Sequence, residues 1–378
     1  MLRFLTAGES HGQALVGILD GIPKGVPLCQ KDFSDLMKKR WDGYRRSPRK
    51  NIENDSVEIL SGVRFGKTLG SPIGLLIKNL DYQNHIDSMN KWELSPDYKP
   101  LTTPLPGHAD YAGGKKFNTD DFRDIRERAS ARETAMRNAL SVPARKLLFE
   151  LGVRSAAFVR KIGSISSNIS ENYSISEVSA ALEQEDASAF LTPDLSVVPS
   201  WKNLVDSAAE KGQTLGGMVE VCFGNLPPGI GSHTQSDLRI DSRLAAIVLS
   251  IPGVKAVEFG EGILQSQLEG ASAHDSFYCE DGEISRKSNM AGGIEGGMTN
   301  GMPLVIRAFM KPLPSTCGLS TVDIKTMKTV AVKPERTDVM ALPALAITLE
   351  SVISIEIASA LIENFSGNTL EKIKDLVS

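Results

Sequence analysis

The sequence predicts a mixed α/β sandwich. Strand-like segments recur along the whole chain, helical stretches lie between them, and the two types alternate without a strict βαβ repeat, which favours layered sheets and helices. At 378 residues the chain is long enough for one large domain or two smaller ones, with ample apolar material for a core. We expect one domain over residues 1–378.

Four segments rich in branched residues and edged by Gly or Pro predict strands: Val57–Leu60, Ile73–Ile77, Met218–Phe223 and Pro303–Phe309. A five-residue echo precedes two of them, GKTLG at Gly66–Gly70 and GQTLG at Gly212–Gly216. The echo suggests two related strand units packed in one domain.

Helical periodicity is clearest from Asp124 to Leu151, where Gly152 can end the helix and Pro143 should kink or interrupt it. A second helix, roughly Ala341–Asn364, is apolar around most of its circumference, which predicts burial on several sides. The segment Ser164–Asp206 is serine-rich and acidic with weak periodicity, so we expect a peripheral excursion without chemistry.

Composition excludes several classes of protein. A hydrophobic share of 41% and a charged share of 23% are those of an ordinary soluble protein. A net charge of -4 argues against general nucleic-acid binding. The apolar stretch at the start of MLRFLTAGESHG is too short for a signal-peptide core, and no apolar run looks long enough for a membrane span, so we expect neither export nor membrane insertion. The cysteines are far apart and form no CxxC pair, which suits the reducing cytoplasm: Cys29, Cys222, Cys279 and Cys317.

Two histidines lie in turns rich in Gly and Pro, His11 within Gly8–Gly12 and His108 within Pro104–Asp110. Such turns let the backbone approach a ligand while an imidazole donates a proton or holds an anion, although a single histidine in a turn is more often structural. No HExxH, GxSxG or Cys/His cluster is present, so the sequence predicts neither a metal site nor a serine hydrolase.

The segment Lys38–Lys50 contains seven cationic residues in an otherwise acidic protein, which suits a small polyanion, a solvated loop or a nucleic-acid patch. Arg126–Thr134 alternates cations with small residues, as in an anion site or in Glu–Arg pairs on a helix face. Asn289–Met298 is a glycine-dense loop, Lys311–Ser315 follows a strand, and Arg336–Asp338 precedes the last helix. From these patterns we expect an α/β enzyme that binds a multiply anionic ligand.

Taken together and in this order, the segments resemble the chorismate synthase family. The resemblance covers nearly the whole chain and rests on GESHG, the arginine loop followed by VEILSGVRFGKTLGSPIGLLIKN, PGHADYAG, ERASARETA, NMAGGIEGG, KPLPS and RTD. It implies a βαβ sandwich, a homotetramer and a requirement for reduced FMN. The implied reaction is the anti-1,4 elimination of phosphate from 5-enolpyruvylshikimate 3-phosphate, which gives chorismate for aromatic amino acid biosynthesis without net redox change.

The resemblance also implies roles for single residues. His11 resembles the general acid near the departing phosphate, and His108 resembles the imidazole that protonates or stabilises reduced flavin near N1. Asp338 resembles the carboxylate that works with flavin N5 when the C6 proton is taken. Ser10 and Ser130 resemble hydrogen-bonding partners that orient the reacting atoms.

Binding residues follow in the same way. The implied substrate-binding residues are Arg40, Arg46, Arg49 and Arg132. The implied FMN-binding residues are Arg128, Ala129, Ser130, Pro252, Gly253, Gly296, Lys311, Pro312, Leu313, Pro314, Ser315 and Arg336. The chain departs from the family pattern at Arg45, Ser47, Leu105, Pro143 and Thr337, none of which is a proposed acid, base or principal substrate arginine.

Two other functions compete with this interpretation. A flavoprotein oxidoreductase would pass hydride from a nicotinamide, but the sequence has no dinucleotide fingerprint. A bifunctional form that reduces its own flavin with NADPH is the weaker version of this alternative, and without an additional domain we favour a monofunctional enzyme. The second competitor is a non-catalytic paralogue that binds FMN or a phosphometabolite.

Overall fold

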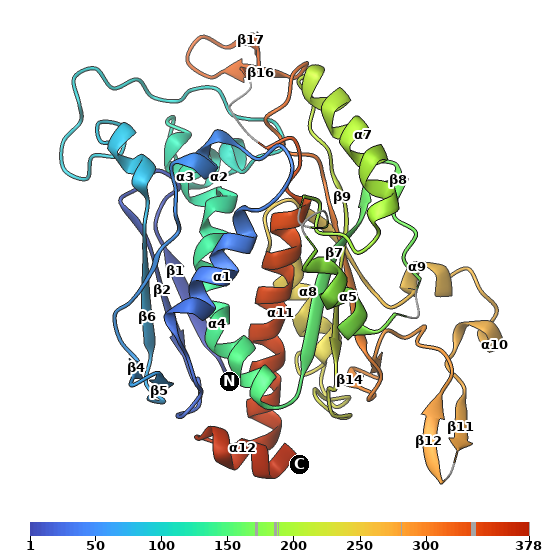
Figure 1. Cartoon of the computed structure of the whole chain (residues 1–378). Helices are drawn as coiled ribbons and strands as arrows, with labels where there is room; N and C mark the ends of the chain where they lie inside the picture. The colour runs from blue at the N-terminus through green and yellow to red at the C-terminus, as the bar shows by residue number, and fades with distance from the viewer. Residues whose placement is uncertain (171–172, 185–186, 188, 281, 334–337, 378) are drawn as a thin grey trace.

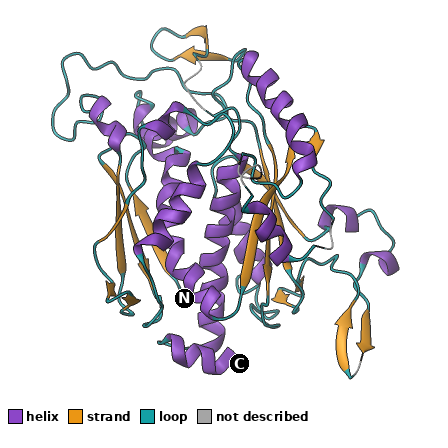
Figure 2. Cartoon of the chain, viewed as in Figure 1, coloured by secondary structure: helices purple, strands orange, loops and turns teal. Residues whose placement is uncertain are grey.

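A computed structural model describes residues 1–170, 173–184, 187, 189–280, 282–333 and 338–377. Two antiparallel sheets enclose a layer of helices (Figures 1 and 2). The first sheet has the order β1-β2-β6-β3, formed by Arg3–Ala7, Ala14–Asp20, Ile73–Lys78 and Val57–Ile59. The second has the order β10-β15-β9-β7-β8, formed by Val254–Phe259, Leu304–Met310, Gly217–Gly224, Arg154–Ile162 and Ile165–Ser166. The predicted sandwich class and all four predicted strands are confirmed.

The central layer consists of α1, α4, α8 and α11, which span Gln30–Trp41, Thr134–Glu150, Ile240–Leu249 and Leu342–Phe365. Helix α4 packs on β2 and β6, and α11 packs on α4 and on β7 and β9. One cluster of buried apolar side chains runs through all three layers.

Shorter elements lie around this core. The helices are α2 Asp110–Phe117, α3 Arg123–Ala129, α5 Ile175–Leu182, α7 Val198–Glu210, α9 Gly262–Gln265, α10 Gly270–Ala273 and α12 Leu370–Val377, with 3-10 turns at Pro48–Asn51, Leu80–Asn84, Ala131–Glu133 and Leu195–Val197. The small antiparallel pairs are β4 Val63–Arg64 with β5 Lys67–Thr68, β11 Phe277–Glu280 with β12 Glu283–Arg286, β13 Ile294–Glu295 with β14 Met298–Thr299, and β16 Ser320–Asp323 with β17 Lys328–Ala331.

Helix α11 confirms the predicted buried helix and corrects the statement that no apolar run could span a membrane. Its length and a mean hydropathy of 1.9 would suffice for a span, but 89% of that window is buried inside the protein. The sheet on one side and α4 on the other cover it, so its hydrophobicity serves the core.

The single helix expected from Asp124 to Leu151 is wrong in its first part. The backbone at Ser130 is extended, with φ -65° and ψ 143°, and separates α3 from the turn that leads into α4. Helix α4 instead continues through Pro143, because its burial between β2, β6 and α11 outweighs the missing hydrogen bond. The prediction that Gly152 ends this helix is confirmed. Gly152 has φ 84°, and the Val153 N–H donates to Leu148 O.

The segment Ser164–Asp206 is only partly peripheral. Phe190 and Trp201 are fully buried in the main core, and Tyr44 packs against Phe190 with ring centroids 5.4 Å apart. The Tyr44 hydroxyl donates to the Asp206 carboxylate, which ties the segment to the basic loop. The prediction of a peripheral segment was wrong in this part because a few large apolar side chains in a polar sequence give no hydrophobic periodicity.

Candidate active site

The Gly8–Gly12 loop joins β1 to β2 and positions His11. Gly8 has φ 109°, and a Cβ atom there would lie 2.4 Å from Ala14 O, so only glycine fits this turn. The Ser10 N–H donates to Glu127 O at 2.9 Å, which fastens the loop to helix α3. The loop near the N-terminus therefore holds His11 against helix α3.

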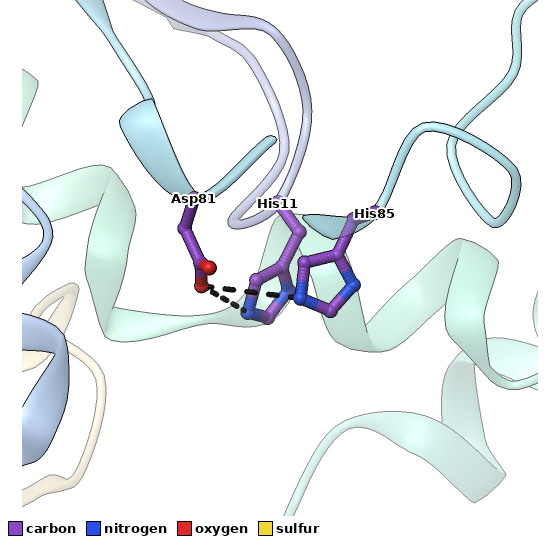
Figure 3. A group of neighbouring side chains, drawn as sticks. All are labelled: His11, Asp81 and His85. Carbon is purple, nitrogen blue, oxygen red and sulfur yellow. Dashed lines mark ion pairs between the residues drawn. The ribbon is translucent and has the colours of Figure 1, made fainter. Parts of the chain in front are cut away.

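Glu127 of α3 orients the His11 ring. His11 Nδ1 lies 3.0 Å from both Glu127 carboxylate oxygens, and the His11 backbone N–H donates to Oε2 at 2.8 Å. Burial acts to raise the pKa of the Glu127 carboxyl. Its hydrogen bonds and charge interaction with His11, together with the charge of Arg123, nevertheless lower this pKa below its usual value. With Nδ1 occupied, His11 Nε2 faces the Asp81 carboxylate at 3.9 Å (Figure 3).

His108 is held in the same way by a second carboxylate. Its Nδ1 lies 2.5 Å from Asp110 Oδ1, and Arg126 of α3 donates to Asp110 Oδ2 from Nε at 2.9 Å and Nη2 at 2.5 Å. Burial acts to raise the pKa of Asp110, but hydrogen bonds from His108, Arg126 and the Leu105 amide lower it. Adjacent residues of α3, Arg126 and Glu127, thus support the two predicted catalytic histidines.

Replacing Asp110 with Asn tests this support through its pH dependence. A carboxyl group whose pKa is lowered in the folded state stabilises that state above its unfolded pKa of about 3.9, and this contribution disappears as the pH falls through the lowered value. We expect Asp110→Asn to lower the melting temperature at pH 7 and the difference from wild type to shrink below about pH 4. A difference that stayed constant down to pH 3 would assign the effect to packing.

Three buried or half-buried arginines surround Trp41. The guanidinium carbons of Arg40, Arg46 and Arg132 lie 5.3, 5.9 and 5.9 Å from the Trp41 ring centroid. Burial, followed by the charges of Arg132 and Arg46, lowers the pKa of Arg40 to about 10, which keeps it cationic at neutral pH. Among the described residues, Arg40 Nε, Arg46 Nε and Trp41 Nε1 are buried donors without a hydrogen-bond partner. A multiply anionic ligand would satisfy such donors.

Acidic residues behind the arginines were not predicted. Glu53 and Asp55 are buried, and Arg132 binds both, with Nη1 2.5 Å from Asp55 Oδ1 and Nη2 3.4 Å from Glu53 Oε2. Arg132 also donates to Asn79 Oδ1, so most of its N–H groups already bind the protein. The signals in the sequence were the acidic residues shortly after the arginine loop and the polar Asn79 directly after β6.

Arg49 links the arginine loop to Ser10. Its Nη1 donates to Ser10 Oγ at 2.8 Å, and its Nη2 donates to Glu53 Oε1 at 3.1 Å. The Ser130 hydroxyl donates to Ser10 Oγ at 3.3 Å, so both predicted serines meet beside Arg49. Burial is the main cause that lowers the pKa of Arg49.

Asp338 lies against the arginine loop. Its Oδ2 is 2.9 Å from Arg46 Nη1, and its Oδ1 accepts a hydrogen bond from the Ser47 amide. Arg336 and Thr337 lie outside the described residues. Arg45 adopts φ 50°, a conformation that glycine prefers, and its side chain pairs with Asp206 at 2.6 Å.

Part of the predicted FMN-binding set meets the His108 turn. Lys311 Nζ donates to Gly107 O, and the Lys311 N–H donates to Gly253 O at 3.1 Å. Gly107 has φ 79°, and a Cβ atom there would lie 3.6 Å from the Pro314 side chain. The Pro252–Gly253 turn and the Lys311–Ser315 segment therefore lie close to His108.

Arg128 and Gly296 lie elsewhere. The exposed Arg128 side chain donates to Thr6 O at 3.0 Å and Gly8 O at 3.3 Å, on the His11 side of α3. Gly296 lies in the β13–β14 turn before β15, whereas Lys311 directly follows β15. Seven residues of strand separate these ends by roughly 20 Å, so the chain does not bring Gly296 and Lys311 together.

A cavity of about 670 Å³ opens beside His108. Its wall combines apolar side chains with two basic side chains, those of His108 and Lys115. Other lining residues include Leu105, Tyr111 and Met327. The volume falls within the range of small-molecule sites. No described contact joins His108 directly to His11 or Asp338, and α3 provides the connection between the two histidines.

Comparisons with known proteins show which family the chain belongs to. The family model described as chorismate synthase matches residues 2–362. A chorismate synthase of Aquifex aeolicus is 43% identical, with 99% of this chain and 96% of that protein covered. One of Desulforamulus reducens is 44% identical, with 99% and 97% covered. A crystal structure of chorismate synthase is 36% identical with a TM-score of 0.78, covering 99% of this chain and 95% of that one. The chain belongs to the chorismate synthase family.

Proposed function

We propose that the site around His11, Arg40, Arg46 and Asp338 carries out the reaction of this family. The chain is a carbon–oxygen lyase that forms chorismate from 5-O-(1-carboxyvinyl)-3-phosphoshikimate. The C3–O bond breaks, phosphate leaves, a proton is lost from C6, and a new double bond forms. The observation that carries the proposal is the pair of imidazoles oriented by buried carboxylates, beside guanidinium groups with unsatisfied buried donors.

In this proposal the arginines around Trp41 bind the substrate. The substrate carries a phosphate and two carboxylates, and Arg40 and Arg46 offer buried N–H donors that no described residue satisfies. Arg49 adds a cation beside Ser10. Because Arg132 binds Asp55, Glu53 and Asn79, we propose that it contributes mainly by keeping this group of cations in place.

Proton transfer is divided between two sides of the site. We propose that His11 donates a proton from Nε2 to the departing phosphate, while Glu127 on Nδ1 keeps the ring oriented. Asp338 is the proposed acceptor for the C6 proton, with its carboxylate placed by Arg46 and the Ser47 amide. Ser10 and Ser130 orient the reacting groups between these residues.

We propose that reduced FMN binds in the region beside His108. The cavity is large enough for a flavin ring, His108 keeps Nε2 free of Asp110, and Lys311 provides a cation beside a turn where glycine permits close approach. We propose that His108, Ala129, Ser130, Pro252, Gly253 and Lys311–Ser315 hold the cofactor, with Arg128 and Arg336 as further candidates. When bound, reduced FMN would supply an electron transiently, with no net redox change.

The assembly is proposed to be a homotetramer of single-domain chains, 1–378, in the cytoplasm. The outer face of the first sheet supports subunit contacts, since Leu5 and Ile18 are paired across β1 and β2 and are 78% and 47% exposed. Such a face is normally polar when it meets only water. One core cluster through both sheets supports a single domain, and four free cysteines suit a reducing compartment.

Turnover without oxygen tests the proposed function. Purified protein given 5-enolpyruvylshikimate 3-phosphate and chemically reduced FMN should release phosphate and form chorismate in equal amounts. FMN binding is measured in the same samples by equilibrium dialysis, with and without substrate. Absence of turnover with FMN bound would favour the non-catalytic paralogue. Turnover supported by NADPH and oxidised FMN alone would favour the bifunctional enzyme.

A further inference from the structure

A second histidine and a carboxylate meet the exposed side of His11. Asp81 lies in the 3-10 turn Leu80–Asn84, and His85 ends that turn, so both come from one short segment after β6. The Nε2 atoms of His11 and His85 each lie 3.9 Å from Asp81 Oδ2, and the two rings are 4.2 Å apart between centroids (Figure 3). One ligand atom from each residue lies within 4.8 Å of the others.

We propose that His11, Asp81 and His85 form a binding site for a divalent transition metal ion, represented by Zn²⁺, which inhibits the enzyme by occupying Nε2 of His11. Two imidazoles and one carboxylate are a donor set for zinc and its neighbours, and the imidazole nitrogens disfavour magnesium and calcium. Three protein ligands leave a coordination position for water, as in open zinc sites.

The spacing requires only a small contraction. Two ligand atoms on a tetrahedral zinc ion lie roughly 3.4 Å apart, given bonds of about 2.0–2.1 Å. The two Nε2-to-Oδ2 distances of 3.9 Å exceed that value by about half an ångström, and the widest separation among the three ligand atoms, at most 4.8 Å, exceeds it by at most about 1.4 Å. The Asp81 carboxylate must move toward His11, whose ring Glu127 holds, and rotation of the partly exposed His85 side chain can bring its Nε2 closer to both.

The surroundings orient two of the ligands as metal sites do. Glu127 binds Nδ1 of His11 at 3.0 Å, which is the carboxylate–histidine arrangement that directs Nε2 toward a metal. Asn84 donates to Asp81 Oδ1 at 2.8 Å and leaves Oδ2 toward the imidazoles. The neighbouring cation Arg123 is paired with Glu127, at 3.3 Å.

The inhibitory consequence rests on the proposed acid role of His11, whereas metal binding does not. A ring whose Nε2 holds a metal cannot carry a proton on that atom, so it cannot protonate the departing phosphate. The sequence predicts no metal site because Asp81 and His85 are about seventy residues from His11 and form no spaced motif with it.

Titration of the full-length protein with Zn²⁺ alone, without flavin or substrate, tests the site by calorimetry. Wild type should bind one equivalent more than His85→Phe, whose ring keeps the contact with the His11 ring but offers no ligand. Asp81→Asn should weaken this binding by at least about a hundredfold, and Glu127→Gln by about ten- to a hundredfold. His233→Asn, an exposed histidine elsewhere, is the matched control and should bind as wild type.

Two outcomes would overturn the proposal. Equal Zn²⁺ binding by wild type, His85→Phe and Asp81→Asn, all folded by circular dichroism, would remove the site. Inhibition is measured in a separate turnover assay. Zn²⁺ should inhibit phosphate release by wild type over the concentration range in which it binds, and EDTA should restore the rate of release. Binding as predicted with unchanged phosphate release would overturn the inhibition, and with it the acid role of His11 in the proposed function.

Discussion

Replacing His11 with Ala should lower kcat for phosphate release by about a hundredfold or more. The reason is that the departing phosphate loses the proton donor at His11 Nε2, and positioned acid–base groups contribute roughly 10²–10⁴ in rate. Substrate binding should change far less, because the arginines around Trp41 remain. Anaerobic single-turnover kinetics, with EDTA present to exclude metal effects, measure the rate and the substrate affinity separately.

The control for this prediction is His274→Ala, an exposed histidine in another part of the chain, which should keep the wild-type rate. Loss of Glu127 offers a second check, since it holds His11 without touching the proposed reaction centre. Glu127→Gln should reduce kcat less than His11→Ala does. A His11→Ala protein that is folded, binds FMN and releases phosphate at the wild-type rate would exclude His11 as the acid.

Replacing Arg46 with Leu should lower kcat/KM by roughly a hundred- to ten-thousandfold. Two charge-assisted hydrogen bonds to an anion contribute about 1.5–3 kcal/mol each, and every 1.4 kcal/mol corresponds to a factor of ten. The variant also leaves Asp338 without its arginine partner. Arg46→Lys should retain part of the affinity, because it keeps the charge but loses the planar fork.

Arg45→Gln is the matched control for Arg46, since the two residues are neighbours in one loop. The Arg45 side chain is partly exposed and pairs with Asp206, away from Trp41 and Asp338. Its kcat/KM should stay within about threefold of wild type, the level expected for loss of an exposed ion pair. Comparable losses in Arg45→Gln and Arg46→Leu would mean that loop conformation, and not a direct contact with substrate, explains the effect.

The elements themselves were largely predictable because local pattern decides them. Four strands and the buried helix α11 followed from runs of branched and apolar residues. Two features were not predicted. The helix breaks at Ser130, whose hydroxyl caps the next turn by accepting from the Arg132 N–H. Helix α4 runs through Pro143, because burial against other elements overrode local preference there. The burial of Phe190 and Trp201 was not predicted either, because two large side chains are too few to give a periodic hydrophobic pattern.

The site shows the same division. By itself the sequence determined which groups are available: two histidines in glycine-rich turns, a basic loop and an aspartate before the last helix. The tertiary structure alone decided their partners, placing Glu127 on His11 across 116 residues of sequence, gathering Asp81 and His85 beside the same ring, and separating Gly296 from Lys311 along β15. Hydrogen bonds and metal ligation depend on distances of a few ångströms, and sheet register and helix packing set those distances between segments whose order in the chain carries no such information.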